Sequence, residues 1–305
     1  MSELTRVLSS NPIEKRSAVK NLIVKILLYA LLILITFITL FPYVWMILTS
    51  FKTNSEATSV DLKLFPEVFR IDSFITLSKL QEQRISNTSF LRAMLNTLII
   101  EVTVIPVGTF VAALAAFSFS KMRLPHKRFF LLFLMSGMMV PYAAVLLPQY
   151  RAFKAIGWVG NEGFAQLFPL IIPGLFGNVG MMFFFIQYLK STPKALIEAG
   201  RIDGASWLRI FIRIVLPAIL PAIAAQVIFW FLGIWNDYFA PSIYLSNEWL
   251  TLQALISQLN DSTARRADIP LVMAGSTLGS IPMIIIYVFF QRYFIQSLAL
   301  TGIKE

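Results

Sequence analysis

Residues 191–217 read STPKALIEAGRIDGASWLRIFIRIVLP and interrupt two long apolar runs with the most charged segment in the second half of the chain. Thr192 and Pro193 are typical of a helix start, because a hydroxyl side chain accepts a hydrogen bond from a free N–H and proline fits the first helical position. We therefore expect a short helix over residues 194–202, placed between two apolar runs.

A glycine is expected to end this short helix, since Gly204 tolerates the positive φ found at many helix ends. A second helix is then expected to begin near Ala205 and to become apolar. Within the first helix, three apolar residues fall on one side: Ala195, Ala199 and Ile202. The stretch thus predicts a surface helix, a break and a return into a buried helix.

The charges of this stretch allow two interpretations. Two acids, Glu198 and Asp203, flank Arg201 in a segment rich in Lys and Arg. Such a segment can be an amphipathic helix lying on a membrane surface, or it can be a docking element for a soluble partner. Composition alone favours the first interpretation.

The composition is that of an integral membrane protein. The 305 residues are 57% hydrophobic and include 27 Phe, and the mean hydropathy is +0.72. Several apolar runs of about 20 residues could each cross a bilayer core of roughly 30 Å. We therefore expect one all-α domain with several membrane spans.

Several function classes are disfavoured by the residue counts. The chain has no cysteine and one histidine, His126, so we expect no disulfide, no thiol catalysis and no metal site, and we expect neither an enzyme nor a cofactor site in this chain. The net charge of +10 comes from basic residues split among short loops, which argues against nucleic-acid binding.

Six transmembrane helices are expected, between a polar segment at 1–24 and a tail at 295–305, so that residues 25–294 form the spanning domain. The expected spans are residues 25–48, 95–119, 129–147, 166–188, 212–235 and 271–290. The longer connections, at 49–92 (with short helices), 149–165 and 236–269, are expected to be polar. Small residues predict close helix packing at two places: Gly108, Ala112, Ala116 and Ser120 in the second span, and Gly275 and Gly279 in the sixth.

The distribution of basic residues predicts the orientation. Six spans put both termini on one side, and of the 26 Lys and Arg residues 16 fall on that side and 10 on the other. Because positive charge concentrates in cytoplasmic loops, we expect both termini and the 191–211 loop to face the cytoplasm. This placement favours the docking interpretation of Glu198.

The chain shows no energy source of its own. It lacks the G-x-x-x-x-G-K-[ST] loop that holds ATP phosphates. Ion-coupled carriers place carboxylates inside the bilayer, whereas Glu101 lies early in the second span and Asp237 just past the fifth, where a structural role is expected. A stand-alone channel or carrier stays open as an alternative, but no span has a regular polar stripe.

A family resemblance rests on the opening stretch. Glu198-Ala199-Gly200, Asp203-Gly204-Ala205 and Ile214-Val215-Leu216-Pro217 together resemble the EAA loop of permease subunits in binding-protein-dependent ABC importers, with Gly200 in place of the third alanine. In that family the loop is a coupling helix that enters a cleft on the ATPase subunit. The resemblance implies ATPase coupling for these residues: Glu198, Ala199, Gly200, Asp203, Gly204 and Ala205.

Other segments are similar to the sugar permeases of maltose or multiple-sugar type: residues 41–45 (FPYVW) with 50–52 (SFK), 233–238 (GIWNDY), and 290–294 (FQRYF) with 302–304 (GIK). The resemblance implies an importer for carbohydrates, in particular oligosaccharides. The implied partners are a second permease subunit, two cytoplasmic ATPase subunits that bind the ATP, an extracytoplasmic sugar-binding protein and the lipid bilayer. A permease of the same superfamily for peptides or other solutes stays open.

Candidate contacts on the sugar path are amide, carboxylate and aromatic side chains in the outer half of two spans: Asn96, Gln226, Trp230, Asn236 and Asp237. Each is equally well explained by hydrogen bonds between helices. In the family the 241–268 loop reaches the binding protein, which makes Asn247 and Trp249 candidate contacts, although an interfacial Trp needs no partner. By the same resemblance the tail at 302–304 is a candidate ATPase contact, with a frayed terminus as the alternative.

Overall fold

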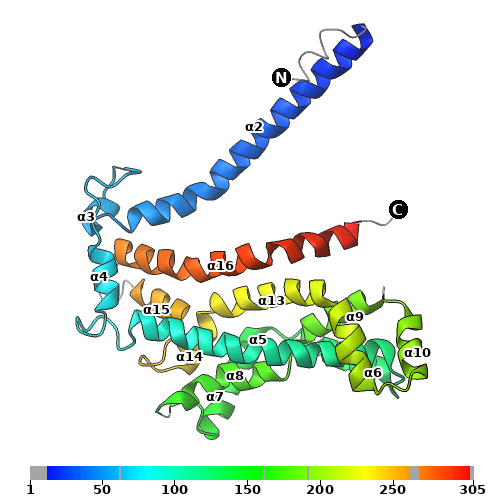
Figure 1. The fold of residues 1–305 in the computed structure, drawn as a ribbon. Helices are drawn as coiled ribbons and strands as arrows, with labels where there is room; N and C mark the ends of the chain where they lie inside the picture. The colour runs from blue at the N-terminus through cyan, green and yellow to red at the C-terminus, as the bar shows by residue number, and fades with distance from the viewer. Residues whose placement is uncertain (1–11, 62, 161, 191, 261–267, 303–305) are drawn as a thin grey trace.

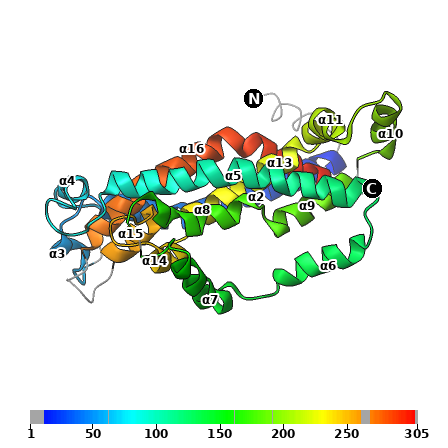
Figure 2. The same ribbon diagram turned by 90° about the horizontal axis from the view of Figure 1, so that it is seen from below.

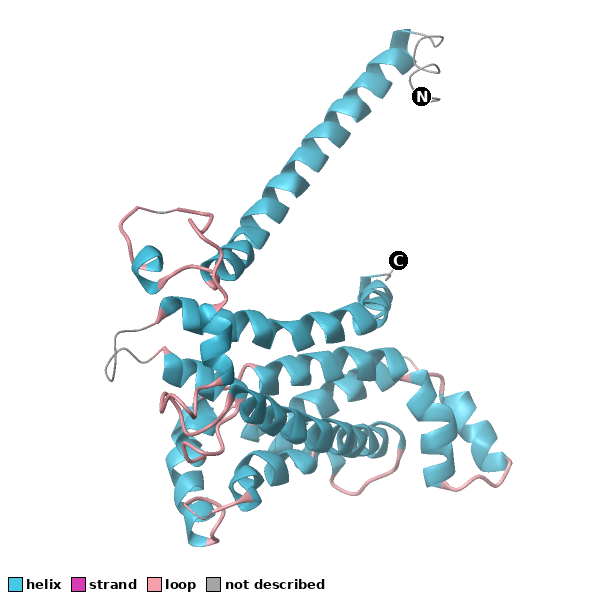
Figure 3. Ribbon diagram, turned by 60° about the vertical axis from the view of Figure 1, so that its left-hand side comes forward, coloured by secondary structure: helices cyan, strands magenta, loops and turns pink. Residues whose placement is uncertain are grey.

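The computed structural model describes residues 12–61, 63–160, 162–190, 192–260 and 268–302, and every regular element in these ranges is a helix (Figures 1 and 3). The longer helices are α2 (Pro12–Thr49), α5 (Phe90–Lys121), α6 (Lys127–Gly137), α7 (Tyr142–Ala155), α8 (Phe168–Leu175), α9 (Val179–Lys190), α10 (Lys194–Ile202), α13 (Leu220–Trp235), α15 (Leu252–Leu259) and α16 (Ile269–Gly302). The short ones are α3 (Asn54–Ala57), α4 (Asp72–Ser78), η1 (Phe164–Leu167), α11 (Trp207–Ile210), the π-helical turn η2 (Phe211–Val215), α12 (Leu216–Ala218) and α14 (Phe239–Tyr244). The all-α prediction is confirmed for these residues.

Four helical stretches are long and apolar enough to cross a membrane: Lys20–Thr49, Phe90–Lys121, Phe164–Lys190 and Ile269–Gln291. Two further pairs qualify only if each bent pair counts as one span. Lys127–Gly137 and Tyr142–Ala155 meet at 90°, and Trp207–Ala218 and Leu220–Trp235 meet at 76°. The described residues therefore hold four to six spans.

The third and fifth expected spans, at 129–147 and 212–235, are each bent in the structure, and no bend was expected there from the sequence. Prolines stand at both bends: Pro141 immediately precedes α7, and Pro217 and Pro221 flank the bend at Ile219. Proline cannot supply the N–H of an interior helical hydrogen bond, so it breaks the helix at a nearby residue.

Several expected boundaries also change. α2 begins at Pro12 rather than near residue 25, and α16 continues to Gly302 through the expected tail. α7 continues to Ala155, within the connection expected to be polar. The 236–269 connection was expected to be a polar loop, yet it holds α14 and α15, whose buried residues pack into the core. Residues 1–11, 191 and 303–305, which belong to the expected N-terminal segment, helix start and tail, lie outside the described part.

α5 is the central helix, with α8, α9, α13 and α15 packed around it. α8 and α13 approach α5 closely at Gly108. A Cβ atom there would stand 2.3 Å from Trp230 Cη2 and 2.5 Å from the carbonyl oxygen of Gly174. Ala112 and Ala116 continue the same buried face. The predicted small-residue contact is thus confirmed.

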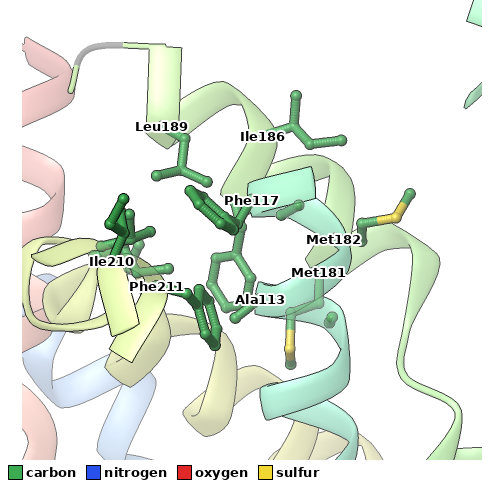
Figure 4. Packing of buried hydrophobic residues seen from close by; sticks show 14 of the residues in the cluster. Ala113, Phe117, Met181, Met182, Ile186, Leu189, Ile210 and Phe211 are labelled. Carbon is green, nitrogen blue, oxygen red and sulfur yellow. The ribbon is translucent and has the colours of Figure 1, made fainter. Parts of the chain in front are cut away.

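The largest apolar cluster lies at one end of α5, where α5, α9 and α11–η2 meet. In Figure 4, Phe117 lies between Leu189 and Phe211, and Ala113, Met181 and Ile210 are nearby. The Phe117 and Phe211 rings are 5.6 Å apart. This cluster fixes the beginning of the fifth apolar segment (residues 207–235) to α5 and α9.

The second small-residue contact is also confirmed. Trp235 Nε1 donates a hydrogen bond of 2.9 Å to the carbonyl oxygen of Gly279, and a Cβ atom at Gly279 would stand 3.2 Å from Leu252 Cδ2. The glycine lets α16 approach α13 and α15 closely.

α2 projects away from the other helices (Figures 1 and 3). None of the most apolar 18-residue stretch of α2 is buried against the rest of the described chain. Its last turns reach α16, where the hydroxyls of Tyr43 and Ser280 are 2.9 Å apart. A helix that is apolar all round requires lipid or another subunit to cover it.

Candidate functional site

The helix predicted at 194–202 is α10, with the expected bounds. Its start differs from the prediction, because Pro193 occupies the cap position with φ −58° and ψ 132°, and no side chain accepts a hydrogen bond there. The predicted cap by the Thr192 hydroxyl is therefore wrong. The proline sits one position earlier than expected, so Lys194 is the first helical residue.

The end of α10 is a complete Schellman motif. Gly204 has φ +77°, its N–H donates to the carbonyl oxygen of Arg201 (3.1 Å), and the N–H of Ala205 donates to that of Gly200 (2.9 Å). These two bonds satisfy carbonyl groups that a helix end leaves free. Ser206 then caps α11 by accepting a hydrogen bond from the N–H of Arg209. The predicted break at Gly204 is confirmed.

One face of α10 packs against the start of the fifth apolar segment. Ile197 and Gly200 are buried on this face. A Cβ atom at Gly200 would stand 3.1 Å from Ile214 Cδ1 and 3.3 Å from Ile210 Cγ1. The close approach accounts for glycine at this position, where the resembling motif has alanine.

The opposite face of α10 is exposed. It carries one carboxylate, Glu198, among small and apolar residues: Ala195, Leu196, Ala199 and Ile202. Ile202 is 85% exposed. Among the described side chains none forms an ion pair with Glu198. Ala195, Ala199 and Ile202, which were predicted to share one side of this helix, all lie on its exposed face.

Arg201 stabilises the bend between α10 and α11. Its guanidinium lies 4.8 Å from the centroid of the Trp207 ring, and its Nη1 donates a 3.1 Å hydrogen bond to the carbonyl oxygen of Ala205. A cation over an aromatic face is attracted by the ring quadrupole. α10 and α11 are therefore connected by side-chain contacts as well as by the chain.

The structure separates the five candidate path residues. Asn96 is buried and its Nδ2 donates to the carbonyl oxygens of Trp249 and Leu250, both at 3.0 Å. Asp237 Oδ1 accepts hydrogen bonds from the N–H groups of Phe239 (3.0 Å) and Ala240 (3.3 Å), at the start of α14. These two side chains have structural partners.

The other three candidates lie along α13. Trp230 packs on Gly108 and is partly buried, Gln226 is also partly buried, and Asn236 is exposed at the end of the helix. Asn236 Oδ1 is 3.5 Å from Gln253 Nε2. The five residues therefore do not form one cluster.

The loop that carries Asn247 and Trp249 is held by side chains from distant parts of the sequence, among them Thr88 and Gln166. The Thr88 hydroxyl donates to the carbonyl oxygen of Asn247 (2.6 Å) and accepts from the N–H of Leu250 (3.3 Å). Gln166 Oε1 accepts from the N–H of Ser246 (2.9 Å). Sequence reasoning missed Thr88 and Gln166, because each is far from the loop along the chain.

Two adjoining hollows of about 540 and 350 Å³ lie beside this loop. Asn87 and Glu248 line both. The Arg92 guanidinium, which lines the first, lies 4.4 Å from the centroid of the Trp249 ring. The loop and the residues beside it thus form a polar surface with charges of both signs.

Glu101 is buried more deeply than its expected place near an interface suggests. It is 3% exposed, and neither carboxylate oxygen has a hydrogen-bond partner in the described residues. Burying a polar group without a partner is costly. Among the described residues, Glu101 is the only carboxylate in the set of buried polar side chains without a hydrogen-bond partner.

The fold and the site define an integral membrane protein in which a short polar helix projects from a bundle of apolar helices. The family model of the binding-protein-dependent transport system inner membrane component matches residues 85–300, and the chain belongs to this family. The predicted family is confirmed. The chain is therefore a membrane component of a transport system that works with a binding protein.

Individual proteins show the same relationship. The chain is 31% identical to the arabinooligosaccharides transport system permease protein AraQ of Halalkalibacterium halodurans, over 88% of this chain and 93% of that protein. It is 29% identical to the maltodextrin transport system permease protein MdxG of Bacillus subtilis, over 92% and 96%. One chain of a bacterial ABC transporter involved in the import of the acidic polysaccharide alginate has the same fold, with a TM-score of 0.74 at 21% identity, over 90% of this chain and 98% of that one.

Proposed function

We propose that this chain is a translocation-pathway subunit of an ATP-driven importer of carbohydrates, in particular oligosaccharides. The observation that carries the coupling part of the proposal is the exposed face of α10. Glu198 stands there among apolar side chains, on a helix whose other face is fixed to the fifth apolar segment through Ile197 and Gly200. A displacement of α10 would therefore also displace the start of the fifth apolar segment, on which it packs.

The soluble partners supply what this chain lacks. We expect two ATPase subunits to bind ATP and to receive α10 in a cleft, where Glu198 pairs with a cation and the apolar side chains are buried. Asp203, Gly204 and Ala205 hold the angle between α10 and α11 through the Schellman motif. Closure of the ATPases then shifts the spans between inward-facing and outward-facing states, because the ATPases bind the two states with different affinity.

The remaining partners are assigned from the exposed surfaces. The apolar surface of α2, uncovered by this chain, is expected to pack on a second permease subunit and on lipid. The polar loop with Asn247 and Trp249 is expected to meet the extracytoplasmic binding protein. This arrangement requires both termini and α10 to face the cytoplasm, as the basic residues predict.

The substrate class rests on the relatives. Their names include arabinooligosaccharides, maltodextrin and diacetylchitobiose, and the structural relative imports alginate. A second candidate function has a specific observation in its favour: a permease 30% identical to this chain, from Synechocystis, is named for uptake of osmoprotective compounds. A substrate of that kind is the alternative.

Two measurements test the proposal. The chain has no cysteine, so Glu198→Cys and Asn247→Cys are single labelling positions. We expect a membrane-impermeant thiol reagent to label residue 247 in intact cells, and residue 198 only after the membrane is opened. Mass spectrometry of the co-purified complex, followed by ligand screening of its binding protein, should identify an ATPase and an oligosaccharide. Labelling of residue 198 in intact cells would contradict the orientation, and a complex without an ATPase would contradict the energy source.

A further inference from the structure

The segment between α10 and α13 does not run along α13. Residues Trp207–Ala218 make an angle of 76° with Leu220–Trp235. α13 is apolar and about 24 Å long at about 1.5 Å per residue, so it accounts for most of one membrane crossing. A segment at this angle to a spanning helix runs close to the membrane plane, and Figure 2 shows α11 at the same end of the molecule as α10.

One face of this segment is fixed to the protein. Ile210, Phe211 and Val215 are fully buried. The Phe211 ring lies 5.6 Å from those of Phe110 and Phe117, both on α5. The orientation of the opposite face is set by this packing.

The opposite face carries a hollow of about 290 Å³. Its lining consists of Ser206, Leu208, Arg209, Ile212 and Arg213. Leu208 and Ile212 are exposed large apolar side chains, and both arginines are exposed as well. Neither arginine forms an ion pair with a described residue. Two guanidinium groups without an ion pair to a described residue thus stand beside uncovered apolar surface.

We propose that this hollow binds an anionic phospholipid of the leaflet on the α10 side, with Arg209 and Arg213 pairing with the phosphate. Guanidinium groups match the geometry of phosphate oxygens and donate charge-assisted hydrogen bonds to them. Leu208 and Ile212 contact the upper part of the acyl chains, as apolar residues of interfacial helices do. The charge complementarity favours a lipid with net negative charge, such as phosphatidylglycerol, over a zwitterionic one.

The bound lipid would hold the connection between α10 and α13 at a fixed depth. Residues 207–218 connect α10 to α13 along the chain, so a movement of α10 is transmitted to α13 through them. A lipid at Arg209 and Arg213 therefore makes transmission sensitive to the charge of the membrane. This inference uses the membrane topology of the proposed function and does not depend on the substrate.

The test uses the full chain in its complex, in nanodiscs of phosphatidylcholine with phosphatidylglycerol, and counts retained phosphatidylglycerol by native mass spectrometry. We expect enrichment over phosphatidylcholine, and Arg209→Gln with Arg213→Gln to lower retention by about fivefold per charge, the factor that about 1 kcal/mol gives. The matched control removes two exposed charges on the same side, Arg123→Gln with Arg128→Gln, and should retain the lipid.

Three results would overturn the inference. Equal retention in the wild type and the Arg209/Arg213 variant would show that the hollow holds no lipid. Displacement of the lipid by inorganic phosphate at millimolar concentration would indicate a general anion site. Crosslinks from Arg209→Lys to an ATPase subunit, in place of lipid retention, would assign the surface to that subunit. Carbohydrate uptake by the same particles is recorded separately, so failure of the transport proposal leaves the lipid count interpretable.

Discussion

Two polar connections of this molecule, the α10–α11 bend and the loop at residues 246–250, are built in opposite ways. The bend is held by neighbours in sequence, through the Schellman bonds at Gly204 and Ala205 and the Arg201 contact with Trp207. The 246–250 loop, named the outer loop after the orientation proposed above, is held by distant residues, and the Thr88 bond to Asn247 joins positions 159 residues apart. The shape of the bend is thus set by local contacts, although Trp207 and Phe211 also pack on Phe117 of α5. The loop, in contrast, cannot change its shape without breaking bonds to residues far away along the chain.

The largest effect is expected when one exposed charge is reversed in each of the two regions and the results are compared. Glu198→Lys should lower ATP-driven uptake by about 5- to 150-fold, the range of a coupling free energy of about 1–3 kcal/mol, because it reverses the exposed charge of the docking face. The protein should still reach the membrane, since Glu198 is exposed. Uptake and ATP hydrolysis in proteoliposomes measure the effect. Glu248→Lys in the outer loop is the matched control and should leave ATP hydrolysis without binding protein unchanged. Wild-type uptake by Glu198→Lys would remove the coupling role.

The next effect concerns the outer loop. Thr88→Val keeps the shape but removes both hydrogen bonds of the hydroxyl, leaving the Asn247 carbonyl and the Leu250 N–H without this partner. Leu250 is buried, and leaving its N–H unsatisfied costs about 1–3 kcal/mol. We expect weaker stimulation of ATP hydrolysis by the binding protein, with unchanged hydrolysis in its absence. Thr88→Ser restores a hydroxyl and should restore the stimulation. Full stimulation of Thr88→Val would show that the loop does not need this anchor.

A smaller effect is expected at the bend itself. Gly204→Val places a β-branched residue at φ +77°, where the left-handed conformation costs a residue with a Cβ about 1–2 kcal/mol. No atom lies within 4 Å of a Cβ built at Gly204, so the cost is conformational rather than a clash. Uptake should fall, and Gly204→Asn should lose less because Asn tolerates this conformation. Equal losses for Val and Asn would contradict the conformational explanation.

The same contrast explains what the sequence could predict. The bounds of α10 and the break at Gly204 were predictable because helix propensity and a glycine end act within a few residues. The spans at α5 and α16 followed from apolar length. The bends at Pro141 and Ile219 were missed because proline marks a break without giving its angle. The buried α15 was taken for a polar loop, since its polar neighbours dominate the composition of residues 236–269.

The site was less predictable than the fold, for a physical reason. Asn96 was identified as a polar residue of interest, but its two partners, Trp249 and Leu250, depend on tertiary packing. Thr88 and Gln166 gave no signal, because a single hydroxyl or amide in a connecting segment is ordinary. Gly200 was recognised as a departure from the motif, and only its distance to Ile214 gives the reason.

The smallest expected effect uses a pair of matched contacts, one in each region. Arg201 lies over Trp207 at the bend, and Arg92 lies over Trp249 at the outer loop. At exposed sites such a contact is worth about 0.5–1 kcal/mol, so each substitution should change its readout only about two- to fivefold. Trp207→Leu should lower uptake per ATP hydrolysed while leaving stimulation by the binding protein intact, and Trp249→Leu should weaken that stimulation while leaving the uptake ratio intact. Both readouts come from one proteoliposome assay. If either variant changed both readouts together, the two regions would be coupled, and the contrast between a locally set bend and a distantly held loop would not extend to function.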